Sequence, residues 1–175
     1  MQRLFVSLLA LFCSSQALAD SGLPAVLKDY GHEVACAAEL DSVAQALIGK
    51  NTSRLYIDAS SPQSSYPVIN GVLDFQDRNA LLALHAYPSA AQQCQIAIEE
   101  SFVLTDPCIS IREEIFSKWS EIGRLNEATS VYKKNKSPYS QIAYLTTAMK
   151  SSPMCLVHIH RDVDSAVTAK DIKLK

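Results

Sequence analysis

The side chains whose type and spacing most directly suggest chemistry in this 175-residue sequence are His158 and His160, in the run MCLVHIHRDV. Alternate side chains of an extended strand point to the same face, so the two imidazoles would lie side by side. Such a pair can bind zinc or copper when a third ligand comes from a neighbouring element, and Asp162, His85 or His32 could supply it. A metal-binding protein or metal-dependent enzyme that uses His158 and His160 is therefore one hypothesis.

The competing interpretation is that the run is an ordinary strand with one wet face. Cys155, Val157 and Ile159 would then point into the core, and the histidines would point outward. An isolated H-x-H lacks the ligand count that makes zinc motifs specific. We favour this interpretation and predict no cofactor.

Other catalytic constellations lack support in the sequence. Cys155 is close to His158 in the chain, but their side chains would point to opposite faces of a strand, and no C-x-x-C motif occurs. The chain has only five glycines, with no G-x-S-x-G elbow and no phosphate-binding glycine loop. The adjacent pairs Glu99-Glu100 and Glu113-Glu114 are expected on solvated surface. We predict that the protein is not an enzyme.

The N-terminus has the pattern of a secretory signal peptide. In MQRLFVSLLALFCSSQALADSG, Arg3 precedes a short apolar core, and Ala17-Leu18-Ala19 fits a cleavage site. We predict a signal peptide at 1–19, cleavage after Ala19 and export by the general pathway to the periplasm of a Gram-negative bacterium. No later segment is apolar for long enough to span a membrane.

The cysteines of the mature chain form an even set, which in an oxidising compartment predicts two disulfides. The set comprises Cys36, Cys94, Cys108 and Cys155. Pairing of Cys94 with Cys108 is disfavoured, because the extended run between them carries the chain roughly 30 Å away. Two pairings remain open: Cys36 with Cys94 and Cys108 with Cys155, or Cys36 with Cys108 and Cys94 with Cys155.

The first half of the chain predicts a helix followed by strands. Residues 23–50 have a helical stripe that ends at Gly49, and 53–60 switch to the two-residue period of a strand. Asn70-Gly71 between two apolar tetrads predicts a hairpin turn. Strands are expected at 79–87 and 94–104.

The second half predicts helices alternating with strands. Residues 108–126 place apolar side chains at helical spacing, and 129–134 form a short strand. Ser137-Pro138 would begin another helix, which ends before the strand that carries the two histidines. We detect no internal repeat in the sequence.

This element order predicts an α+β fold: a mainly antiparallel sheet of about five strands, helices packed on one face and two disulfides. It would form a single domain over 20–163, followed by a flexible tail at 164–175. The formal net charge of -2 offers no electrostatic footprint for nucleic acid.

Function is predicted mainly from what the sequence lacks, because a small, exported, disulfide-tied domain without a catalytic constellation favours a binding role. The serine- and proline-rich segment 59–67 is expected to project, with Ser64, Ser65 and Tyr66 as partner-binding residues. The leading hypothesis is a non-enzymatic periplasmic protein that binds another protein, as an inhibitor or immunity protein against a cell-wall-degrading enzyme does. Besides the metal hypothesis, an accessory subunit of an envelope secretion or pilus assembly is a further alternative. The oligomeric state is not predicted.

Overall fold

The structure is a computed structural model that describes residues 36–49, 51–58, 68–88, 94–149 and 152–164. The predicted signal peptide and its cleavage site lie outside these residues. So do the loop 59–67 with its three predicted binding residues and nearly all of the predicted tail. These predictions stay as stated above.

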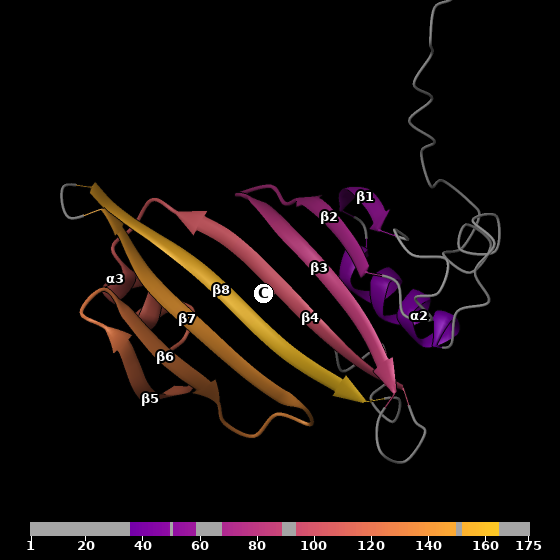
Figure 1. Cartoon of the computed structure of the whole chain (residues 1–175). Helices are drawn as coiled ribbons and strands as arrows, with labels where there is room; N and C mark the ends of the chain where they lie inside the picture. Colours follow the sequence, from indigo (N-terminus) through magenta and orange to yellow (C-terminus); the bar gives the residue numbers. More distant parts are fainter. Residues whose placement is uncertain (1–35, 50, 59–67, 89–93, 150–151, 165–175) are drawn as a thin grey trace, which may run out of the picture.

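The described chain forms one antiparallel sheet of eight strands in the order β1-β2-β3-β4-β8-β7-β6-β5 (Figure 1). Two short helices accompany it, α2 (Ala37–Ile48) and α3 (Cys108–Glu114). The fold is therefore mostly β, with more strands than the five expected. The strands are β1 (Thr52–Asp58), β2 (Val68–Asp74), β3 (Asn79–Pro88), β4 (Cys94–Leu104), β5 (Trp119–Asn126), β6 (Thr129–Lys134), β7 (Ser140–Met149) and β8 (Ser152–Asp164).

The chain builds this sheet from two similar units. Each unit is a helix followed by four sequential antiparallel strands, α2 with β1 to β4 and α3 with β5 to β8. The second unit runs in the reverse order across the sheet, so β4 and β8 meet in the middle (Figure 1). The sequence did not show this repetition, because the two units share an arrangement of elements and not an evident pattern of residues.

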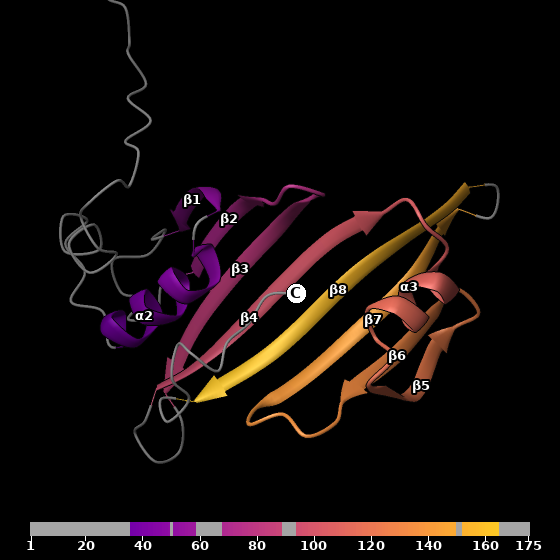
Figure 2. The ribbon, with the colours of Figure 1, turned by 180° about the vertical axis from the view of Figure 1, so that it is seen from behind.

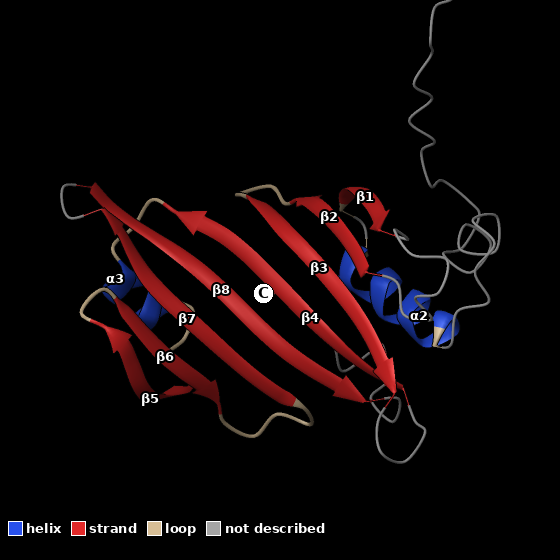
Figure 3. Cartoon of the chain, in the orientation of Figure 1, coloured by secondary structure: helices blue, strands red, loops and turns tan. Residues whose placement is uncertain are grey.

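Both helices lie on the same face of the sheet, as expected from the sequence (Figures 2 and 3). The predicted stripe of α2 is confirmed, because Leu40, Val43, Ala44 and Leu47 are all buried. Gly49 ends the helix with a positive φ of 53°, a conformation that costs glycine little. One hydrophobic cluster lies under each helix. In the described part of the chain, neither helix is long and apolar enough to span a membrane.

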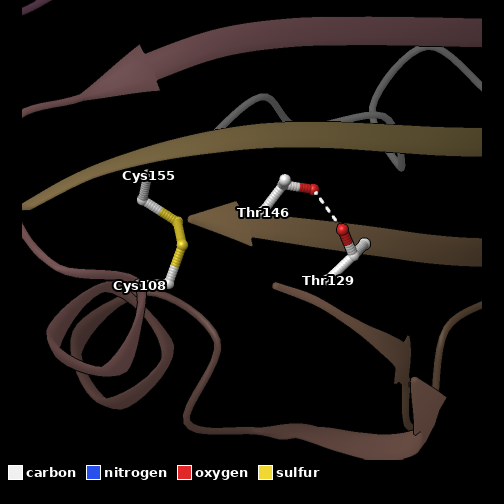
Figure 4. Close-up of a disulfide and its surroundings, with 4 residues drawn as sticks. All are labelled: Cys108, Thr129, Thr146 and Cys155. Carbon is white, nitrogen blue, oxygen red and sulfur yellow. Dashed lines mark hydrogen bonds between the residues drawn. A yellow bond between two sulfur atoms is a disulfide. The ribbon is translucent and has the colours of Figure 1, made fainter. Parts of the chain in front are cut away.

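Each helix is tied to the fourth strand of its unit by a disulfide. Cys36, just before α2, bonds to Cys94 of β4, and Cys108 of α3 bonds to Cys155 of β8. Figure 4 shows the second bond, together with the Thr129–Thr146 hydroxyl contact of 3.0 Å that joins β6 to β7. One of the two pairings left open by the sequence is therefore the observed one.

The predicted hairpin turn at Asn70-Gly71 is wrong. Both residues lie inside β2, which pairs without interruption with β1 and β3. The glycine is needed for a close approach: a Cβ atom at position 71 would lie 2.5 Å from Leu55 Cδ2 and 3.0 Å from the Arg54 carbonyl oxygen. Glycine inside a strand often marks such an approach rather than a turn.

The predicted helix over 108–126 is right only in its first two turns. α3 ends at Glu114, and Trp119–Asn126 forms the edge strand β5. Apolar residues at helical spacing are buried or partly buried up to Trp119, whose ring meets Phe116 edge-on at 5.1 Å between centroids. Beyond Trp119, Ile122 is exposed. The helical spacing of apolar residues therefore continues in the sequence, but the residues after Trp119 do not pack as a helix would.

The predicted helix after Ser137-Pro138 is also wrong, because Ser140–Met149 forms strand β7. Burial there has a period of two: Gln141, Ala143 and Leu145 are buried, while the residues between them are more exposed. Pairing with β6 on one side and β8 on the other overrides the weak helical spacing. The other predicted strands, at 53–60, 79–87, 94–104, 129–134 and around His158, are confirmed within the described residues.

Candidate functional site

Neither described helix covers the second face of the sheet, which is turned toward the viewer in Figure 3. We call this surface the open face. At its centre it carries the alternate residues of β4 and β8 that point away from the helices. These are Gln95, Ala97, Glu99, Ser101 and Val103 of β4, and Leu156, His158, His160, Asp162 and Asp164 of β8.

Glu99 lies between the two histidines of the H-x-H pair. Its Oε1 is 2.6 Å from His160 Nδ1, and its Oε2 is 2.6 Å from His158 Nε2. The register explains this arrangement, because Glu99 is directly opposite His160 and Ser101 is directly opposite His158. The side chains of Glu99 and His160 retain 30% and 27% of their exposure, so the contacts are half-buried.

Further contacts extend this group into a chain across three strands. Ser101 Oγ lies 2.8 Å from His158 Nδ1, and His160 Nε2 lies 3.1 Å from Asp162 Oδ1. The hydroxyl of Tyr87 on β3 donates a hydrogen bond of 3.2 Å to the same Asp162 oxygen. We call the six residues Ser101, His158, Glu99, His160, Asp162 and Tyr87 the histidine–carboxylate network.

The hydrogen-bonding partners of His160 favour its protonated, positively charged form. A carboxylate only accepts hydrogen bonds, and His160 has a carboxylate oxygen near each ring nitrogen, so both nitrogens must carry a proton to satisfy both contacts. Burial alone would lower the pKa of His160. The hydrogen bonds and negative charges of Glu99 and Asp162 outweigh burial and raise that pKa above 6.5. Burial, together with the charge and hydrogen bond of Asp162, likewise raises the pKa of Tyr87.

The described residues give the metal hypothesis no assembled site. No group of three His, Cys, Asp or Glu side chains among them is arranged to hold a metal ion. Of the third ligands named from the sequence, Asp162 contacts His160, His85 lies on the same face on β3, and His32 is outside the described residues. Metal binding at His158 and His160 stays a prediction.

The order Ser101, His158, Glu99 resembles a hydrolytic triad but differs from one in two respects. The serine contacts Nδ1 and the acid contacts Nε2, which reverses the ring nitrogens of the serine-protease arrangement. In addition, β4 pairs at Ser101 with β3 on one side and β8 on the other, so its backbone N–H groups are used within the sheet. Acyl transfer needs such donors for the developing oxyanion.

An apolar zone adjoins the network on the open face. Val103 and Leu156 are directly opposite each other on β4 and β8 and are 48% and 38% exposed. Leu81 on β3, opposite Ser101, is 64% exposed. Large apolar side chains gathered on an uncovered surface are typical of binding sites.

The prediction that Glu99 and Glu100 both lie on solvated surface is wrong for Glu100. The two residues do face opposite ways, but Glu100 is 1% exposed and pairs on the helix side with Arg161, with 2.7 Å between Oε2 and Nη2. The sequence could have indicated this burial. By strand alternation, Glu100 shares a face with the apolar residues Ile98 and Phe102, and Arg161 shares a face with Ile159 and Val163. Glu99 gave no such signal, since its partners depend on which strand lies beside β4. Glu113 and Glu114 are exposed, as expected.

Comparison with known proteins gives no relative: no family model, no curated protein and no solved structure matches this chain.

Proposed function

We propose that this protein is a non-enzymatic periplasmic binding protein that blocks a cell-wall-degrading enzyme, as an inhibitor or immunity protein does. The observation that carries the proposal is the open face, where exposed Leu81, Val103 and Leu156 adjoin the histidine–carboxylate network. Large exposed apolar side chains that lie next to polar groups on one surface are typical of protein-interaction sites.

The dimensions of the open face support a stable complex. Eight strands at about 4.8 Å spacing make the sheet roughly 34 Å wide. The eleven residues of β4 extend over roughly 36 Å. A standard protein interface buries about 800 Å² on each partner, which this surface can supply. Two disulfides that hold the helices to the central strands favour a rigid surface, and rigidity lowers the entropic cost of binding.

The contacts of Ser101 support a binding role over hydrolysis, because its strand retains no pair of N–H groups for an oxyanion. The projecting loop 59–67 remains a second candidate contact surface, outside the described residues.

The test is inhibition of peptidoglycan hydrolysis by the purified mature protein, measured against a panel of muramidases, amidases and endopeptidases. We expect stoichiometric inhibition of at least one of them. Leu81→Asp, on the open face, should weaken inhibition at least about tenfold. The matched control is Ile109→Asp on α3, where the replaced side chain is equally exposed at 64% but lies on the helix side of the sheet. Failure to inhibit any enzyme of the panel, or equal losses in the two variants, would contradict the proposal.

A further inference from the structure

The open face carries an uneven set of charged side chains on its four central strands, β3, β4, β8 and β7. The described positions that point to this face hold no lysine or arginine. Arg161, the basic residue of β8, points to the helix side and pairs with Glu100. Every charged or titratable nitrogen on the four central strands of this face therefore belongs to a histidine, at His85, His158 and His160.

The carboxylates on the same surface are Glu99, Asp162 and Asp164. No lysine or arginine faces these carboxylates from the described positions of the four central strands, so acidic side chains are in excess at the centre of the open face. Glu99 and Asp162 retain side-chain exposures of 30% and 40%, so a partner can reach part of each side chain, although Glu99 Oε2 itself is buried. Half-buried charges are screened less by salt than charges on a fully solvated face.

We propose that the open face docks a protein partner with a basic surface, whose arginine or lysine side chain contacts Glu99 and Asp162 while an apolar side chain packs on Leu81, Val103 and Leu156. This inference rests on the proposed function and specifies the chemistry of the partner. Peptidoglycan bears carboxylates, so basic side chains near the cleft of an enzyme would favour its binding, and an anionic face would be complementary to such side chains.

The register sets the spacing that the partner must match. Along β8, Leu156 precedes His160, the residue opposite Glu99, by four positions, and precedes Asp162 by six. At about 3.3 Å per residue, Leu156 is roughly 13 to 20 Å from the acidic positions along the strand, whereas Leu81, opposite Ser101, is only two residues from Glu99 along β4, or about 7 Å. A folded surface can present apolar and basic side chains at both separations.

The experiment measures the affinity of the mature protein for lysozyme, a strongly basic muramidase, by calorimetry at about pH 8. The test variant is Glu99→Gln with Asp162→Asn. The matched control is Glu113→Gln with Glu114→Gln, an equal change of charge at two exposed positions of α3. Thermal unfolding checks that both variants fold, and Asp162→Asn alone serves as a milder variant.

We expect the open-face variant to weaken binding at least about tenfold and the control to change it less than about twofold. Raising the salt from about 0.05 to about 0.3 M should weaken binding of the unmodified protein more than that of the open-face variant. If lysozyme binds equally well to both variants, the inference is wrong although the proposed function stands. If only acidic hydrolases of the panel are inhibited, the inference is likewise wrong. If no hydrolase is bound or inhibited, both the inference and the proposed function are wrong.

Discussion

The buried ion pair between Glu100 and Arg161 leads to a quantitative prediction about stability. Its two side chains are 1% and 4% exposed, and one contact of 2.7 Å joins them. Glu100 Oε1 and the Nε and Nη1 atoms of Arg161 have no hydrogen-bond partner within the described part of the chain. The pair is thus desolvated but only partly satisfied, which is the condition in which a buried ion pair contributes least to stability.

Removing one partner should therefore be costly, while removing both should not. Arg161→Met leaves the Glu100 carboxylate buried without a counter-charge, and we expect a loss of about 3 to 5 kcal/mol in the free energy of unfolding. The double variant Glu100→Leu with Arg161→Met replaces both charges with apolar side chains between the two hydrophobic clusters. It should be within about 1 kcal/mol of the unmodified protein or more stable than it.

Urea unfolding with the disulfides intact measures these differences. With a slope of about 2 kcal/mol per molar urea, the single variant should lower the midpoint by about 2 M. The control is Arg124→Met, which breaks the exposed pair with Glu121 and should change stability by less than about 0.5 kcal/mol. A loss below about 1 kcal/mol for Arg161→Met, or a double variant as unstable as the single one, would refute the reasoning.

Three further predictions concern the sheet, the network and a disulfide. Gly71→Ala should cost about 1 to 3 kcal/mol in urea unfolding because its Cβ would meet β1, whereas Gly123→Ala, with nothing within 4 Å, should have little effect; similar values would contradict this. The folded-state pKa of His160 is raised, so its contribution to stability is complete below about pH 6.5 and is lost as the pH rises through the raised pKa. Unfolding free energies measured from about pH 6 to about pH 9 should therefore fall more in the unmodified protein than in His160→Gln, and parallel curves would exclude the effect. Replacing Cys108 and Cys155 together by serine should cost about 2 to 5 kcal/mol, and an unchanged melting temperature would show that this bond does not stabilise the fold.

Strand periodicity made part of the sheet predictable. In β8, alternation separated inward from outward side chains correctly, including the outward position of both histidines. Cysteine spacing disfavoured the pairing of Cys94 with Cys108 and left two alternatives, one of which forms. These properties depend on neighbours within one segment, which a sequence displays directly.

Two elements were mispredicted because a local signal was weaker than pairing with distant strands. Residues 140–149 have apolar side chains at helical spacing but lie between β6 and β8, where backbone hydrogen bonding on both sides stabilises a strand. Asn70-Gly71 has the residues of a tight turn, yet the glycine allows β1 to pack closely. Neither sequence pattern contains the position of the neighbouring strand.

The same distinction applies to the candidate site. The amino-acid sequence by itself determined that His158, His160 and Asp162 share one face of a strand, because the side-chain period of a strand is fixed by backbone geometry. Only the tertiary structure decided that Glu99 lies between the histidines, since the pairing of β4 with β8 joins residues about sixty positions apart in the chain. It also decided that neither described helix covers this face, because both helices pack on the opposite side, where the inward-pointing residues of the strands offer apolar surface to bury.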